Sequence, residues 1–370
     1  MLVLLFLYFH SLIISQSNLC EHYLDNIAGQ PIAEYTHSKS GTIHKLEGPE
    51  KARNIVFKAT GDYNDGDTWT LNNHPVIVTY NGGEELLPTA VLVGDVVQAV
   101  VMESKLRLML QKPTPQESLI ENGHFVNPIN QRGKTDYTTV GYTIDRWRLD
   151  SLGTVSIGSN KIILTASSEN TLYFSQLLNV TDKILDKIMT FSVLLANGSI
   201  YYATGTIREG IHITNISSGW ISCYMINTRP GILFTAGKGL VLEPVAAKLE
   251  PGNRFTGWPV WDYGAELEKC RRYFRTMVKY DAWSSIGIMP SYIDFPLSNA
   301  YGMRDKPTII NAENFDLFDS KDLNTALEGF TFSIAVFGLS VRLRATKRNH
   351  GITGSAFLQT KDKIYLSSEL

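Results

Sequence analysis

The stretch Leu119–Leu149, LIENGHFVNPINQRGKTDYTTVGYTIDRWRL, constrains the fold of this chain more than any other segment. Asn122-Gly123 is a turn dipeptide, and Gly133 and Gly141 interrupt the polar segment that follows it. The stretch then reaches Trp147, a residue type that folded proteins bury on average. A segment of this kind can wrap the edge of a β-sandwich and place one large aromatic side chain in the core.

Charged side chains surround Trp147 in the sequence, and they admit two interpretations. Asp145 and Arg146 precede the tryptophan, and Arg132 and Arg148 lie nearby. In the first interpretation the aromatic face stacks on a sugar ring while the charged groups hydrogen-bond its hydroxyls. In the second, which we favour, Trp147 is buried in a structural corner and Asp145 pairs with an arginine.

Two later phrases extend the pattern: AAKLEPGN (Ala246–Asn253) and YGAELEKCRRYF (Tyr263–Phe274). Together with the first stretch they resemble the galactose-binding-like jelly-roll module of bacteriophage and prophage tail-fibre and minor structural proteins. Such modules open with "INGxFxxxQRG…YTxDRW" and close with "KLExG…YGxELxxCxRYF". The segment Ser291–Ile310 also resembles the "FPxPMRxxPTI" phrase that follows this module, so the resemblance covers roughly residues 36 to 370.

The resemblance implies that the motif residues are mainly structural. They are Asn122, Gly123, Phe125, Gln131, Arg132, Gly133, Asp145, Arg146, Trp147, Glu250, Cys270 and Tyr273. Related modules hold a structural calcium through an "NGDFE" phrase. Here His124 and Val126 stand at the acidic positions, so we predict no metal or other cofactor at this spot.

The composition favours an all-β fold and argues against nucleic acid as a partner. The 34 Lys and Arg against 36 Asp and Glu give a net charge of −2. Few charged residues and many Gly, Tyr and Phe suit short strands joined by turns. Cys20, Cys223 and Cys270 are too scattered for a disulfide framework or a zinc site. A single Cys223–Cys270 bridge remains an alternative to free buried thiols, which we favour.

We predict a small N-terminal β module, a central jelly-roll β-sandwich, a short helix and a C-terminal β domain. Asp262 is the expected cap of the helix, with Leu267, Cys270, Phe274 and Met277 on its apolar face. The expected segments are a leader-like stretch (1–20), a connector (21–45), the small module (46–112), the jelly roll (118–255), the turn and helix (256–277) and the C-terminal domain (278–370).

The first residues, Met1–Ile14, are apolar but too short to span a membrane, so we predict no membrane insertion. They lack a basic residue before the apolar run and a convincing cleavage site. Two interpretations remain: a true leader, or translated sequence upstream of the real start. We favour the second.

No catalytic pattern stands out in the sequence. The sequence has no nucleophile elbow (Gly-x-Ser-x-Gly), no zinc-protease motif (His-Glu-x-x-His), no phosphate-binding loop and no dinucleotide-binding motif (Gly-x-Gly-x-x-Gly). Its eight histidines form no cluster with the spacing of metal ligands. No carboxylate pair suggests a glycan hydrolase. Asp62, Asp65 and Asp67 lack the spacing of a calcium loop and fit a tight turn. We therefore expect a protein that is not an enzyme.

The leading functional hypothesis is a phage tail structural and receptor-recognition protein of the virion. It would display a lectin-like sandwich toward host cell-surface glycans beside other tail proteins. The first alternative is a glycan-binding accessory module of a secreted bacterial protein, and the second is a glycan hydrolase.

Four aromatic residues are the expected ligand contacts: Tyr137, Tyr142, Trp258 and Trp261. The structural alternative for the two tryptophans is packing at the seam between the sandwich and the C-terminal domain. The resemblance further implies a homotrimer. The long β-prone run Phe330–Leu343 supports this, because it exceeds what one small sandwich needs and would leave an exposed strand edge.

Overall fold

The computed structural model describes residues 31–277, 282–289, 291–297, 303, 307–337, 340–348, 350–352 and 355–368. The leader-like stretch 1–20 lies outside these residues. The chain forms two compact units, one of residues up to Gln116 together with Gly252–Pro259, the other of the remaining residues. Nearly all regular structure is β-strand, so the predicted all-β class is confirmed.

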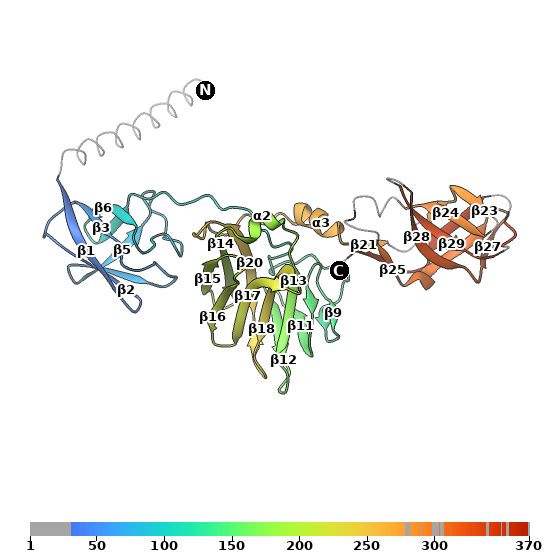
Figure 1. Cartoon of the computed structure of the whole chain (residues 1–370), viewed down its shortest axis with the longest axis horizontal. Coiled ribbons are helices and arrows are strands. Elements are labelled where there is room, and N and C mark those ends of the chain that lie inside the picture. The colour runs from blue at the N-terminus through green and yellow to red at the C-terminus, as the bar shows by residue number, and fades with distance from the viewer. Residues whose placement is uncertain are drawn as a thin grey trace, which may run out of the picture. The chain divides into compact units, whose positions relative to one another are not determined.

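The first unit is a closed seven-stranded barrel, drawn in blue and cyan in Figure 1. The strand order around it is β1-β2-β4-β5-β7-β6-β3, with parallel pairing of β1 to β3, β2 to β4 and β5 to β7. Phe57, Trp69 and Leu106 lie in its core. The strands are β1 (Ile32–Ser40), β2 (Ile43–Glu47), β3 (Asn54–Lys58), β4 (Thr68–Leu71), β5 (His74–Thr79), β6 (Val96–Met102) and β7 (Lys105–Leu108).

The connector predicted over 21–45 is wrong where the structure describes it, because β1 and most of β2 lie there. The barrel therefore begins at Ile32 rather than at residue 46. These two strands were not predicted, because two of their inward positions are the polar residues His37 and His44, which are buried. An apolar alternation, the usual sign of a half-buried strand, is thus missing.

The boundary predicted after residue 255 is also corrected. Gly252–Pro259 belong to the barrel unit, where Arg254 forms an ion pair of 2.8 Å with Asp95. The same guanidinium donates to the backbone oxygens of Thr89 and Ala90. These contacts fix the segment to the barrel after the last sandwich strand has ended at Pro251.

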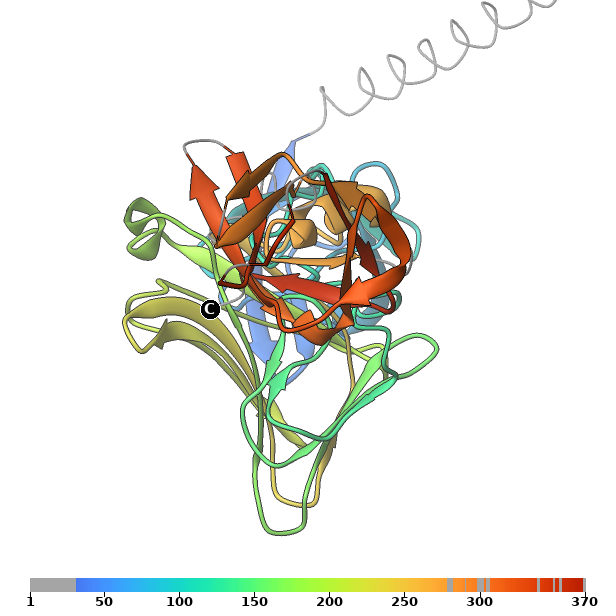
Figure 2. The same ribbon diagram turned by 90° about the vertical axis from the view of Figure 1, so that its right-hand side faces the viewer.

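The second unit begins with a β-sandwich built from three sheets of the described chain. Their orders are β16-β17-β18-β13-β10-β9, β19-β12-β11-β8 and β15-β14-β20. Figure 2 shows its olive strands curving along their length. The strands are β8 (Asp136–Tyr137), β9 (Gly141–Tyr142), β10 (Arg148–Leu149), β11 (Gly153–Ile157), β12 (Ile162–Ala166), β13 (Leu172–Leu177), β14 (Met189–Leu195), β15 (Ile200–Gly205), β16 (Ile211–Ile216), β17 (Gly219–Ile226), β18 (Arg229–Ala236), β19 (Val241–Leu242) and β20 (Pro244–Pro251), with the short helix α2 (Asp182–Leu185) after β13.

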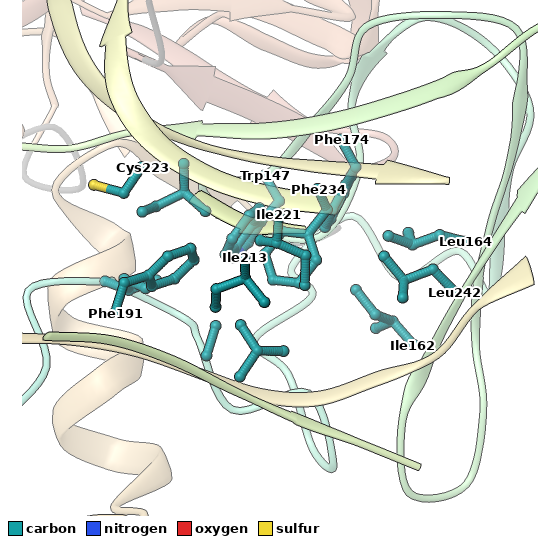
Figure 3. Packing of buried hydrophobic residues seen from close by; sticks show 14 of the residues in the cluster. Trp147, Ile162, Leu164, Phe174, Phe191, Ile213, Ile221, Cys223, Phe234 and Leu242 are labelled. Atoms are coloured by element: carbon teal, nitrogen blue, oxygen red, sulfur yellow. The ribbon is translucent and has the colours of Figure 1, made fainter. Parts of the chain in front are cut away.

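The sandwich core centres on Trp147, which is completely buried. Its ring stacks on Phe174 at a centroid distance of 4.9 Å and meets the edges of Phe125 and Phe234. Aliphatic side chains from the opposing sheets close the core around these rings (Figure 3). Cys223 is buried in the same cluster, and both it and Cys270 are free thiols.

Helix α3 (Tyr263–Arg271) follows the sandwich, and Asp262 caps it by accepting a hydrogen bond from the Ala265 amide. The helix is shorter than predicted, because Phe274 and Met277 lie on the next strand, β21. Backbone pairing of β21 (Phe274–Met277) with β31 (Ile364–Ser367) satisfies the groups that another helical turn would otherwise have paired. Glu266 and Cys270 are the buried residues of the helix, and Leu267 is not.

The C-terminal β domain has three sheets within its described residues, in the orders β21-β31-β25, β22-β30-β26-β27 and β23-β24-β29-β28. The run Phe330–Leu343 becomes most of the hairpin β28–β29, and Ile334 and Leu343 fill the domain's own core. The run is therefore not surplus to the core. The strands are β21 (Phe274–Met277), β22 (Ala282–Ser284), β23 (Gly287–Met289), β24 (Tyr292–Pro296), β25 (Thr308–Ile310), β26 (Phe315–Asp319), β27 (Asp322–Leu327), β28 (Thr331–Phe337), β29 (Ser340–Thr346), β30 (Ala356–Thr360) and β31 (Ile364–Ser367), with the 3-10 turn η2 (Ala312–Asn314).

Candidate functional site

The motif residues form a buried corner whose centre is Asn122. Its side-chain amide donates to the backbone oxygens of Ile129 (2.9 Å) and Asp145 (2.8 Å) and accepts from the Ile129 amide (2.7 Å). Its own carbonyl accepts from the Trp147 indole at 2.9 Å, and its amide donates to the Glu266 carboxylate. Buried polar groups are costly when unpaired, so this one residue lets the chain turn inside the core.

Asp145 and Gln131 join this corner to the strand that follows α3. The buried carboxylate of Asp145 accepts from the Gln131 amide group at 2.6 Å and from the Arg132 guanidinium at 3.3 Å. Gln131 also donates to the Phe274 carbonyl at 2.8 Å. Arg132 lies over the Phe274 ring at 3.8 Å. The arginine pairing expected for Asp145 in a structural corner is therefore present.

Arg146 connects the corner to Glu121, to the end of β13 and to Tyr273. It donates to Glu121 at 2.6 Å and to the Leu177 carbonyl at 2.6 Å, and its guanidinium lies 3.6 Å from the centre of the Tyr273 ring. The Tyr273 hydroxyl donates to the other oxygen of Glu121 at 3.3 Å. Cys270 is buried beside these acidic groups, and burial above all raises the pKa of its thiol.

Two glycines and a buried ion pair complete the motif set. A β-carbon on Gly123 would lie 2.6 Å from the Ala247 carbonyl oxygen, so the close approach of this turn to β20 requires glycine. Gly133 adopts a positive φ of 69°, which favours glycine. Glu250 is buried and lies 2.9 Å from the Lys248 ammonium on the same strand. Burial lowers the pKa of Lys248, while Glu250 opposes that shift.

We predict that Asn122→Gly lowers the free energy of unfolding of the sandwich by roughly 2–4 kcal/mol, because three side-chain hydrogen bonds vanish inside the core. Asn122→Ala should cost about 1 kcal/mol more, since alanine disfavours the left-handed φ that glycine accepts. The native φ at this position is 52°. Scanning calorimetry of the full chain measures both losses. The exposed Asn215→Ala is the matched control, and equal stability of all four proteins would contradict a structural role for the corner.

The aromatic ligand candidates of the second unit, Tyr137, Tyr142 and Trp261, lie in different surroundings. Tyr137 is only 7% exposed, so it is not a solvent-facing platform, and its hydroxyl donates to Asn130. Burial raises the pKa of Tyr137 to about 12. Trp261 stacks on His124 at 4.8 Å, while Trp258 belongs to the barrel unit and meets the edge of Phe255. Tyr142 lines an open groove, and the other three are not among the residues that line it.

That groove, of about 510 Å³, lies on the outer face of the six-stranded sheet of the sandwich. One row of cross-strand partners runs over its floor, in the order Tyr142, Arg148, Ser175 and Leu233. Successive residues of a strand point to opposite faces, so the same strands present Phe174 and Phe234 to the core. The groove residues are Tyr142, Arg146, Arg148, Asp150, Tyr173, Ser175, Leu177, Tyr224, Ile226, Asn227, Arg229 and Leu233.

Three tyrosines stand around this floor. Tyr142 comes from β9, Tyr173 from β13 and Tyr224 from β17, so the outer two are separated by four strand spacings. At ~4.8 Å per spacing this is roughly 19 Å, wider than a single sugar ring. Tyr173 is 39% exposed, and Trp220, which faces the same side of β17, is 40% exposed.

Polar groups lie between the tyrosines. The Asp150 carboxylate accepts from the Ser175 hydroxyl and lies 3.1 Å from the Arg148 guanidinium. Arg229 and Asn227 come from the hairpin turn that joins β17 to β18. The groove therefore combines aromatic faces with donors and acceptors that are already positioned, a composition typical of a small-ligand site.

Sequence reasoning did not find most of this groove. A signal was present, because Tyr173 and Ser175 on β13 alternate with buried apolar residues, as Ser222 and Tyr224 do on β17. The alternation was used to predict strands and their core faces. The same pattern names the outward residues, but it does not tell which outward faces line up across a sheet.

A second cluster that the sequence did not reveal lies inside the barrel. His37 and His44 are joined ring to ring at 2.9 Å, and His44 lies 3.0 Å from the Asp67 carboxylate. Lys39 donates to the same Asp67 oxygen at 2.6 Å, and so does the Asn64 amide at 2.8 Å. The histidines stand seven positions apart, on either side of a tight hairpin turn, which brings them together.

The hydrogen bonds from His37 to His44 to Asp67, which we call the relay, all run in one direction. The Thr60 amide donates to Nδ1 of His37 at 2.9 Å, so that nitrogen carries no proton. Nε2–H of His37 then donates to Nδ1 of His44, and Nε2–H of His44 donates to Asp67. Both imidazoles are therefore neutral. A further proton on either ring would meet another N–H donor.

We predict that the barrel loses stability as the pH falls from 6.5 toward 4. Burial, together with the nearby His44 and Lys39, lowers the pKa of His37 to about 4. Burial also lowers the pKa of His44, although Asp67 opposes the shift. Between pH 6.5 and 4 these histidines bind protons in the unfolded chain but not in the folded barrel. The free energy of unfolding therefore falls by roughly 2 kcal/mol over this range, after allowance for solvent screening.

Urea unfolding of the full chain at pH 7 and pH 4.5 measures this loss. Asp67 contributes little between these two pH values, because burial raises its pKa but hydrogen bonds from Lys39, Asn64 and His44 outweigh burial and lower it, so its contribution is lost mainly at more acidic pH. His37→Gln retains an acceptor and a donor but cannot titrate, so its pH dependence should be smaller. The exposed His74→Gln should behave as the native chain does. Identical stability at the two pH values would contradict the relay.

Neither a metal cluster nor a membrane span is found in the part of the chain that the structure describes. There, no group of three or more His, Cys, Asp or Glu side chains is arranged so that it could hold a metal ion. Its helices are also too short or too polar to cross a bilayer. In comparisons with known proteins, the sequence matches no family model and no curated protein.

Proposed function

We propose that the chain is a non-enzymatic receptor-recognition protein of a phage or prophage tail, and that the sandwich groove binds a host-surface glycan. The observation that carries the proposal is the groove itself. Tyr142, Tyr173 and Tyr224 stand around a floor of Ser175 and Leu233. Sugar rings have one face of C–H groups and a rim of hydroxyls, and they need both an aromatic face and hydrogen-bonding groups.

The polar groups of the groove suit hydroxyl recognition. The Asp150 carboxylate already accepts from Ser175 and pairs with Arg148, and a charged acceptor binds a hydroxyl more strongly than a neutral one. Arg148 and Ser175 lie on β-strands and Asp150 directly follows β10, so the sheet register sets their positions. A pre-formed site loses little entropy when the ligand binds.

The charge pattern favours binding over hydrolysis. Glycan hydrolases commonly use two carboxyl groups on either side of the scissile bond. Among the described residues that line the groove, Asp150 is the only carboxylate, and Arg148 and Ser175 engage it. The tail assignment rests on the resemblance of the motif phrases. A glycan-binding module of a secreted bacterial protein would use the same groove, and neighbouring tail, holin or lysin genes would separate the two hypotheses.

We predict that Tyr173→Ala and Tyr224→Ala each weaken glycan binding about tenfold, the effect of ~1.4 kcal/mol of lost stacking. The melting temperature should change little for Tyr173→Ala, because this side chain is 39% exposed. A glycan array followed by calorimetric titration measures both effects.

The matched control is Tyr263→Ala. This tyrosine is also exposed but lies on α3, outside the groove. The proposal fails if the native chain binds nothing on the array, or if the groove variants bind as tightly as the Tyr263 control.

We further propose that the chain assembles as a homotrimer through the edge strand β28. This strand ends the sheet β23-β24-β29-β28, and its Thr331 and Ser333 side chains are exposed. An open edge of this kind can pair with another chain. Closed assembly would also place several weak sugar sites together, so that avidity compensates for modest affinity.

Light scattering of the full chain at micromolar concentration should give three times the mass of one 41.3 kDa chain. Ser333→Lys should reduce the mass to that of a monomer, because lysine on an edge strand opposes strand pairing. Ser320→Lys, in an exposed turn of the same domain, should leave the trimer intact. A monomeric native chain would contradict this assembly.

A further inference from the structure

The groove carries one cation more than its acidic side chains balance. Arg148 pairs with Asp150 at 3.1 Å, and Arg146 pairs with Glu121 at 2.6 Å. Arg229 lines the same groove and is exposed. No Asp or Glu of the described chain lies within ion-pair distance of it. Two of the three guanidinium groups that line the groove are thus paired with a carboxylate, Arg146 with Glu121 from outside the lining, and the charge of Arg229 is left for a ligand.

The backbone holds Arg229 at the rim of the groove by an unusual turn. Asn227 and Thr228 occupy the two turn positions with φ values of 45° and 69°, and Ile226 pairs with Arg229 across the hairpin. Two-residue turns with positive φ at both positions fit the twist of a hairpin, but they favour Asn and Gly. A β-branched threonine there is strained, and such strain persists where the surroundings fix the local geometry.

We propose that the groove selects glycans that carry a carboxylate, such as uronic or sialic acids, and that Arg229 binds this group. This inference rests on the proposed glycan-binding function. The planar guanidinium matches a carboxylate with two parallel hydrogen bonds, which gives geometric selectivity as well as charge. The tyrosines bind the apolar faces of the sugars, and Ser175 and Asp150 bind hydroxyls. A neutral glycan would leave the charge of Arg229 unmatched.

The test uses the full chain and matched ligand pairs: oligogalacturonate, oligoglucuronate and sialyllactose, each beside its carboxyl methyl ester. The ester keeps the ring and the hydroxyls and removes the negative charge. We expect the acid of at least one pair to bind roughly tenfold more tightly than its ester, as a charge-assisted hydrogen bond predicts. The preference should also weaken with added salt, because the site is open to solvent.

Variants at Arg229 separate charge from geometry. Arg229→Ala should abolish the preference for the acid, so that the affinity for the acid falls to that for its ester. Arg229→Lys should retain only part of the preference, because an ammonium group cannot form the two parallel bonds. Arg208→Ala removes the same charge at an exposed ion pair with Asp186, outside the groove, and should leave the preference intact.

Several results would overturn the inference. Esters that bind as tightly as their acids, or an array on which only neutral glycans bind, would refute acid selection while leaving the groove a glycan site. Equal binding of a sulfated galactan oligosaccharide would refute carboxylate recognition in favour of unspecific anion binding. An array with no binding at all would instead remove the proposed function on which the inference rests.

Discussion

The burial of Trp147 in a fully hydrogen-bonded corner is the constraint on which the rest of the sandwich depends. The indole stacks on Phe174, and its N–H is satisfied by the carbonyl of Asn122. This fixes the start of β10, where Arg148 faces outward and Leu149 inward. Arg148 then lies beside Ser175 in the register and forms part of the groove floor. The core therefore determines the geometry of the outer face.

Both units solve the same problem, which is to bury polar groups without leaving them unpaired. In the sandwich, the buried side chains of Asn122, Asp145 and Gln176 donate to or accept from backbone groups. In the barrel, the His37–His44–Asp67 relay does this with neutral rings, stacked on Trp69 and Phe57. Satisfied networks of this kind specify one arrangement of the chain, because any partial arrangement leaves a buried group unpaired.

The fold class and most strands were predictable because period-two alternation is a local signal. The same argument explains the failures. Strands β1 and β2 escaped because histidines replace aliphatic residues at inward positions, and α3 was drawn too long because Phe274 and Met277 continue its spacing on a strand. The groove was missed because its side chains come from β9, β10, β13, β17 and β18, and their alignment depends on sheet order. Of the four proposed aromatic contacts, Tyr142 alone is among the residues that line the groove. Tyr137 was proposed as solvent-facing, because the sequence does not show whether a tyrosine on a short strand is buried or exposed.

The central claim is that the outer face of the six-stranded sheet binds glycan. The most direct test is an NMR titration of the chain, with its tyrosines isotopically labelled, using an oligosaccharide that the array shows to bind. The chain has 17 tyrosines, which report on both units and on both faces of the sandwich. The account predicts that the resonances of Tyr142, Tyr173 and Tyr224 shift together and saturate at one ligand concentration, while that of Tyr263 stays unchanged. Saturable binding that leaves those three resonances in place would contradict it.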